Sequence, residues 1–136
     1  MRQRVAKSRA WLLLAAVATL PGVGLAATTP LAIHIHSDKA MFQVLISPGT
    51  VGVDSFILQL MTGEGTPLTT KQATLVLTSP SQNSEPMERK AVLGSDGYWH
   101  VDDVKLPQAG RWHMRIDAVT LFKTITLEDD FEVPAQ

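Results

Sequence analysis

The chain has 136 residues, of which 18% are charged, and it carries a formal net charge of −1. That length suits one domain with one hydrophobic core. Cysteine is absent, which excludes thiolate metal sites, thiol catalysis and structural disulfides, so the fold must be held by its core alone.

Residues 1–26 have the pattern of a secretory signal peptide. Four basic residues precede an apolar run of eleven residues, 10–20, which a Pro-Gly pair ends. Small residues allow cleavage after Ala26, with Ala27 as the second choice. The apolar run is well short of the roughly 20 residues that span a bilayer. We therefore expect export to the periplasm and not an uncleaved anchor.

Residues 27–136 form the expected mature domain. The signal holds four of the twelve Lys and Arg and none of the thirteen Asp and Glu, so the mature chain has a net charge of −5. An acidic exported protein has no electrostatic basis for binding nucleic acid or anionic lipid. Metal cations and basic partners are not repelled.

Short apolar runs, separated by turn residues, follow one another through the mature chain. β-branched residues dominate them, and no window keeps a helical apolar period. The pattern predicts an all-β protein, an immunoglobulin-like antiparallel β-sandwich of seven to eight strands in a single domain. The runs are Leu31–His36, Ala40–Ser47, Val51–Met61, Ala73–Thr78, Pro86–Val92, Tyr98–Val101, Gly110–Ala118 and Leu121–Leu127.

The first run contains His34 and His36, and Met41 follows at the start of the second. In a strand, both imidazoles lie on one face and Ile33 and Ile35 on the other. The two histidine Cα atoms are then roughly 6.5–7 Å apart, which two ligands of one metal ion can bridge. A nearby thioether suits soft Cu(I). The pattern alone leaves open a second interpretation, in which both histidines are simply solvated on an edge strand.

The remaining candidate ligands are expected to have structural roles. Asp38 is the nearest oxygen donor, but it suits the turn between the first two runs. His100 is expected at the surface. His113 lies between two arginines in sequence, which disfavours a cation by charge repulsion. The other methionines, Met61 among them, are predicted to be core or loop residues.

Catalytic patterns are missing from the sequence. There is no nucleophile elbow, no H-E-x-x-H motif and no phosphate-binding glycine loop. Asp102 and Asp103 are adjacent and face opposite ways in a strand, and Glu128 to Asp130 resembles a solvated acidic end. The sequence therefore predicts a protein that is not an enzyme.

Several motifs resemble those of an exported domain associated with CopD-type copper-resistance membrane proteins. Two of them are also similar to the D-G-x-[YW] and A-G-x-W signatures of YtkA-like domains. The similarity covers nearly the whole mature chain. The segments concerned are His34–Met41, Pro48–Gly52, Asp96–Trp99 with Leu106-Pro107, and Ala109–Trp112.

The resemblance implies a periplasmic copper-homeostasis protein that binds or transfers copper through His34, His36 and Met41. In CopD-type fusions the domain follows membrane helices, whereas this chain has only a signal. The resemblance therefore implies a free periplasmic form or an accessory subunit, with a CopD-type membrane transporter as the expected partner. CopC itself uses a histidine at the mature N-terminus, a mode that does not carry over here. The alternative is a metal-free interaction module docking on a membrane protein, as in cytochrome-oxidase assembly.

Overall fold

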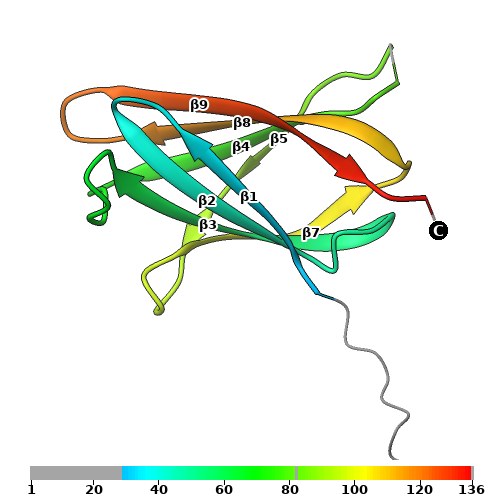
Figure 1. Cartoon of the computed structure of the whole chain (residues 1–136), viewed down its shortest axis with the longest axis horizontal. Helices are drawn as coiled ribbons and strands as arrows, with labels where there is room; N and C mark the ends of the chain where they lie inside the picture. Colours follow the sequence, from blue (N-terminus) through cyan, green and yellow to red (C-terminus); the bar gives the residue numbers. More distant parts are fainter. Residues whose placement is uncertain (1–28, 82, 136) are drawn as a thin grey trace, which may run out of the picture.

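The computed structural model describes residues 29–81 and 83–135, and the predicted signal peptide lies outside this part of the chain. The described residues form nine β-strands in two sheets that pack face to face (Figure 1). The strands are β1 (Leu31–His36), β2 (Ala40–Ser47), β3 (Gly52–Thr62), β4 (Gln72–Thr78), β5 (Met87–Lys90), β6 (Val92–Leu93), β7 (Trp99–Leu106), β8 (Gly110–Val119) and β9 (Thr124–Val133).

Both sheets are antiparallel, which confirms the predicted β-sandwich. The first sheet has five strands in the order β1-β2-β3-β7-β6, and the second has four in the order β5-β4-β8-β9. Strand β1 is therefore an edge strand of the first sheet, and it contacts β9, an edge strand of the second.

The core follows directly from period-two alternation along the strands. In β2, Phe42, Val44 and Ile46 are buried and alternate with half-buried residues. In β8, the buried residues Trp112 and Met114 begin the same alternation. Because each sheet turns one apolar face towards the other, the two inner faces form one continuous core.

Three predicted strands differ from those observed. The run Tyr98–Val101 covers only the beginning of β7, which continues to Leu106. The predicted run Pro86–Val92 is divided between the sheets: β5 pairs with β4, and β6 pairs with β7. The chain crosses at Ala91, whose N–H donates to the carbonyl of Ala73 at 2.9 Å. This crossover raises the strand number of the described residues from the expected seven or eight to nine.

The last strand begins later than predicted and extends further. Leu121 and Phe122 are exposed at the tip of the β8–β9 turn and not in a strand. The hydroxyl of Thr120 closes this turn by accepting the N–H groups of Phe122 and Lys123. Strand β9 then continues through the acidic segment 128–130, so this segment is not a free acidic end. Apolar character alone marked the turn as strand.

The glycine and tryptophan motifs have structural roles. Gly97 has a positive φ of 86° in the β6–β7 hairpin, which glycine adopts without strain. Gly110 begins β8 at φ 124°, and an added Cβ there would lie 3.1 Å from Pro80. Trp99 and Trp112 are buried. These residues therefore determine the architecture.

The turn between β2 and β3 is organised by a buried carboxylate. Asp54 is 1% exposed, and its Oδ1 accepts the N–H groups of Gly49 at 2.6 Å and Thr50 at 3.3 Å. These backbone donors would otherwise lack a partner near the core, which is energetically costly. The Pro48–Gly52 motif therefore depends on Asp54 for its conformation.

Opposite this turn, a bulge in β7 is tied to the second sheet. The pairing of β3 with β7 shifts register between Asp54 and Phe56, and Asp103 there has a positive φ of 54°. The guanidinium of Arg89, in β5, donates to the carbonyls of Asp102 at 2.7 Å and Asp103 at 3.1 Å. Arg89 thus links the two sheets at the edge where the chain crosses between them.

Replacing Asp54 with Ala is expected to lower the free energy of unfolding by about 1–3 kcal/mol, because two backbone N–H groups lose their acceptor. Urea denaturation of the mature chain measures this change. Asp102→Ala, at an exposed side chain, is the control and should change stability by less than about 0.5 kcal/mol. Equal effects of the two substitutions would show that the carboxylate does not hold the turn.

Candidate metal site

The two histidines of β1 lie on the outer face of the five-stranded sheet. His34 and His36 are exposed, whereas Ile33 and Ile35 between and before them are buried. The two imidazole rings have centroids 6.1 Å apart and planes tilted by 39°. The predicted placement of both imidazoles on one face of a strand is therefore confirmed.

Strand pairing brings Met41 beside this pair. The β1–β2 hairpin places His36 directly opposite Met41, and His34 directly opposite Gln43. Side chains that face each other in an antiparallel pair have Cβ atoms about 4.5–5.5 Å apart. Met41 is half-buried and alternates with the buried residues Ala40 and Phe42. The structure thus gathers all three predicted site residues on one face of two neighbouring strands.

The hairpin that joins these strands is closed by Ser37. Its Oγ accepts the N–H groups of Lys39 and Ala40, each at 3.1 Å. The sequence assigned this turn-closing role to Asp38, so that assignment was wrong. Because the turn is only three residues long, it fixes the register that sets His36 opposite Met41.

A second thioether lies next to Met41. Met61, in β3, is paired directly with Met41 and is half-buried on the outer face. The sequence prediction that Met61 belongs to the core or to a loop was therefore wrong. Alternation could have indicated this position, because Phe56, Leu58 and Leu60 point inwards and leave odd-numbered residues of β3 outside.

In the rest of the described structure, nitrogen and oxygen ligands do not gather into a ready metal site. Within residues 29–81 and 83–135, no three His, Asp or Glu side chains are grouped so that they could hold a metal ion. The candidate site on β1 and β2 instead combines imidazole nitrogen with thioether sulfur.

His100 lies on the same outer face but is engaged by a carboxylate. Its Nε2 is 2.9 Å and 3.0 Å from the two oxygens of Asp96. Asp96 also accepts the N–H of Tyr98, and this hydrogen bond, followed by the one with His100, lowers the pKa of Asp96. The pair stabilises the β6–β7 turn, in agreement with the expected surface position of His100.

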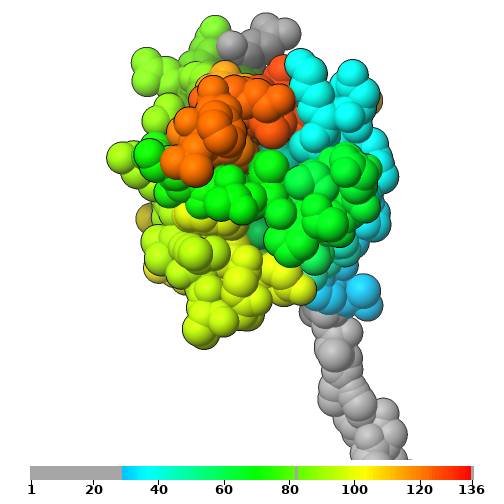
Figure 2. All heavy atoms as spheres, turned by 90° about the vertical axis from the view of Figure 1, so that its left-hand side faces the viewer, coloured from blue at the N-terminus to red at the C-terminus, as the bar shows by residue number. Residues whose placement is uncertain are grey.

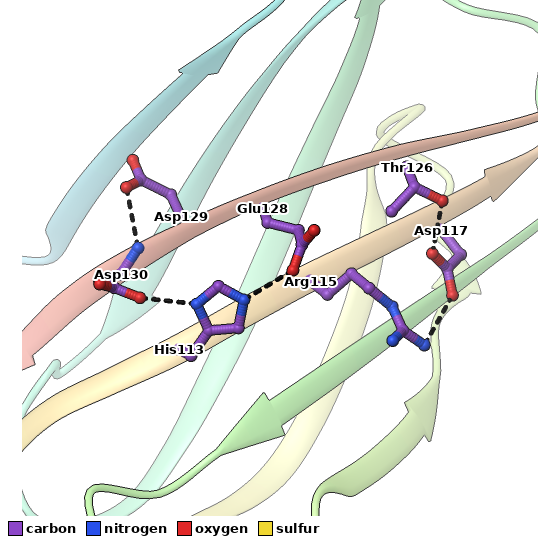
Figure 3. Close-up of polar contacts among 7 residues, drawn as sticks. All are labelled: His113, Arg115, Asp117, Thr126, Glu128, Asp129 and Asp130. Carbon is purple, nitrogen blue, oxygen red and sulfur yellow. Dashed lines mark hydrogen bonds and ion pairs between the residues drawn. The ribbon is translucent and has the colours of Figure 1, made fainter.

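His113 lies at the centre of an ion-pair cluster on the other sheet (Figure 3). Its Nδ1 is 2.6 Å from Asp130 and its Nε2 is 2.8 Å from Glu128, both in β9. Arg111 also donates to Asp130, at 3.0 Å. Hydrogen bonds to Asp130 and then Glu128 raise the pKa of His113. Sequence neighbours suggested that arginines dominate here, but the facing strand supplies carboxylates.

The same contacts act on Asp130 in the opposite direction. Its hydrogen bond with His113, followed by that with Arg111, lowers the pKa of its carboxyl group. His113 uses both ring nitrogens for these ion pairs, one on each side of the ring, as Figure 3 shows. A metal ion would therefore have to displace one carboxylate from the ring.

The raised pKa of His113 predicts a pH-dependent contribution to stability. The ion pairs contribute in full below about pH 6.5, the ordinary pKa of histidine, and the contribution is lost as pH rises through the raised value in the folded state. His113→Gln should therefore destabilise the protein more at pH 6 than at pH 9, measured by urea midpoints. An equal loss at the two pH values would contradict the assignment. Imidazole NMR titration checks the pKa directly.

Comparison of the sequence with known protein families and with curated proteins finds no significant match. Two solved structures of FetP from uropathogenic Escherichia coli have a similar fold. A copper-bound variant has 9% identity and a TM-score of 0.57, covering 79% of this chain and 98% of FetP. The as-isolated protein, produced in the periplasm of E. coli, has 10% identity and a TM-score of 0.57, covering 79% and 97%.

At this level of identity the similarity establishes the fold and does not transfer residues. The described part of the chain contains no helix that is long and apolar enough to cross a membrane.

Proposed function

We propose that this protein is a periplasmic, non-enzymatic copper-binding protein whose ligands include His34, His36 and Met41. The observation that carries the proposal is the pairing of His36 with Met41, beside His34, on one exposed sheet face. This pairing places imidazole nitrogen and soft thioether sulfur side by side, where both can bind one ion.

Each of these side chains has a distinct part in binding. The imidazoles of His34 and His36 are exposed and free to offer a ring nitrogen in the neutral form. The thioether of Met41 stays uncharged at every pH and favours a soft ion. Because the face is open to solvent, an incoming ligand from another protein can reach the ion, which suits transfer as well as storage.

The comparison with FetP supports the proposal at the level of architecture. A sandwich with a TM-score of 0.57 to this chain is known with copper bound, and FetP has also been produced in the periplasm. The predicted signal peptide gives the same compartment. In an oxidising compartment, a cysteine-free site of histidine and methionine avoids thiol oxidation.

A membrane transporter of CopD type is the proposed partner for copper exchange. Three loops meet at the end of the sandwich where His36 and Met41 lie: the β1–β2 turn, the β3–β4 loop and the β8–β9 turn. Figure 2 shows them side by side. Asp38 and Lys123 line one shared hollow there, and Leu121 and Phe122 are exposed. This end offers a contact surface next to the proposed ligands.

Removing both imidazoles is expected to weaken copper binding at least tenfold, because two of the three proposed ligands disappear. The mature chain and the double substitution His34→Ala with His36→Ala are titrated with Cu(I) and with Cu(II) against a competing chelator. The matched control is His100→Ala with His113→Ala, which removes the two histidines elsewhere and should leave copper affinity unchanged.

Two outcomes would contradict the proposal. One is that the mature chain binds copper no more tightly than the buffer does. The other is that both double substitutions alter affinity equally, since the imidazoles of β1 would then have no special part.

A second function is favoured by the position of β1. Among the described strands, β1 pairs only with β2 in its sheet, so one side of its backbone is available to add a strand from another protein. A metal-free module docking on a membrane protein, as in cytochrome-oxidase assembly, would use this edge. The neighbouring edge strand β9 carries four acidic residues, which disfavour the addition of another strand, whereas β1 carries none.

The two functions separate in a copurification experiment. The mature chain is coexpressed with a CopD-type membrane protein, and the complex is isolated with and without chelator. Complex formation that survives both chelator and the substitution of His34 and His36 favours the metal-free module. Loss of the complex under either condition favours copper exchange.

A further inference from the structure

One row of side chains crosses three strands of the five-stranded sheet. His36 is paired with Met41, and Met41 is paired in turn with Met61. Neighbouring strands are about 4.8 Å apart, so the backbone positions of His36 and Met61 are separated by roughly 10 Å. Met41 occupies the centre of the row. The side chains of His36 and Met61 can therefore both reach towards the space above Met41.

Both methionines lie on the outer face and are only half-buried. Met61 alternates with the buried residue Leu60, and Met41 with Phe42. Methionine has three rotatable bonds and a polarisable sulfur, so two adjacent thioethers can converge on one ion without a change in the backbone. The strand pairings that set these neighbours are long: six residue pairs join β1 to β2, and eight join β2 to β3.

The backbone of Met61 is held on both sides. Strand β2 pairs with it on one side, and Pro67 forms an isolated bridge with it on the other. The N–H of Leu68 donates to the carbonyl of Leu60 at 3.0 Å, which fastens the returning loop. A cavity of about 250 Å³, lined in part by Met61, Gln59 and Tyr98, leaves room for the thioether to turn. The position is therefore fixed while the side chain stays adjustable.

The outward strand positions around the row are neutral, whereas the charged residues Asp38 and Lys39 lie in the turn between β1 and β2. The outward positions beside the row in β2 and β3 carry Gln43 and Gln59, which face each other. In the strand segments 31–36, 40–47 and 55–62, no outward position carries a carboxylate. Cu(II) favours nitrogen and oxygen ligands, whereas soft thioethers favour Cu(I). Neutral ligands do not compensate the charge of the bound ion, so they suit a monovalent ion better than a divalent one.

We propose that Met61 is a fourth ligand, which makes this face a site of two histidines and two methionines selective for Cu(I). The inference rests on the proposed copper-binding function and specifies its oxidation state. Met41 and Met61 provide the soft ligands that distinguish Cu(I), and His34 and His36 provide the nitrogen ligands that either oxidation state accepts.

The test replaces the sulfur and keeps the shape. Met61→Leu removes one thioether with little change in volume. Its Cu(I) affinity, measured by chelator competition, is expected to fall at least tenfold, while its Cu(II) affinity stays within twofold of the unmodified chain. Met87→Leu is the matched control, because Met87 is also half-buried but lies in β5 of the other sheet. It should change neither affinity.

X-ray absorption of the Cu(I)-loaded chain gives an independent reading. The number of sulfur neighbours of copper should be two in the unmodified chain and one in Met61→Leu. Urea unfolding of both leucine variants verifies that they are folded.

The outcomes distinguish this inference from the function on which it rests. If Cu(I) binding depends on His34 and His36 but is the same in Met61→Leu, copper binding stands and the ligand role of Met61 is overturned. If the unmodified chain binds neither copper ion, both are overturned. A loss of Cu(I) and Cu(II) binding in equal proportion in Met61→Leu would also contradict selectivity for Cu(I).

Discussion

The contact between Phe56 and Phe131 joins the two sheets inside their shared core, on which the whole sandwich depends. Phe56 lies in β3 and Phe131 in β9, with ring centroids 6.1 Å apart in an edge-to-face arrangement. Trp112 stacks on Phe131 at 6.5 Å, and its indole N–H donates to the carbonyl of Gln108. Without cysteine, such aromatic packing must do what disulfides do in many exported domains.

This packing also determines the outer face. A strand that slipped by one residue would exchange its inner and outer side chains. Because Phe42 and Phe56 are held inside the core, Met41 and its neighbours in β2 and β3 are held outside. The candidate site therefore needs no binding pocket of its own. Its side chains are aligned by the same register that fills the core.

Much of this could be predicted from alternation within single strands. The faces of β1, β2 and β8, and with them the placement of His34 and His36, follow from local sequence. Alternation within β3 also gives the outward face of Met61, but not its neighbour, because Met41 is twenty residues away and their pairing depends on the β2–β3 turn. The carboxylates around His113 were missed for the same reason, since they come from the facing strand. The crossover at Ala91 has no clear apolar signal.

The two open sides of the sandwich are secured differently. On one side the chain itself crosses between the sheets, and Arg89 ties β5 to the backbone of β7. On the other side β1 and β9 contact each other but are not paired in one sheet. Local opening requires least free energy where the fewest contacts must break. Transient separation of the sheets should therefore begin at β1, so that its amide hydrogens exchange with solvent before those of β3 or β8.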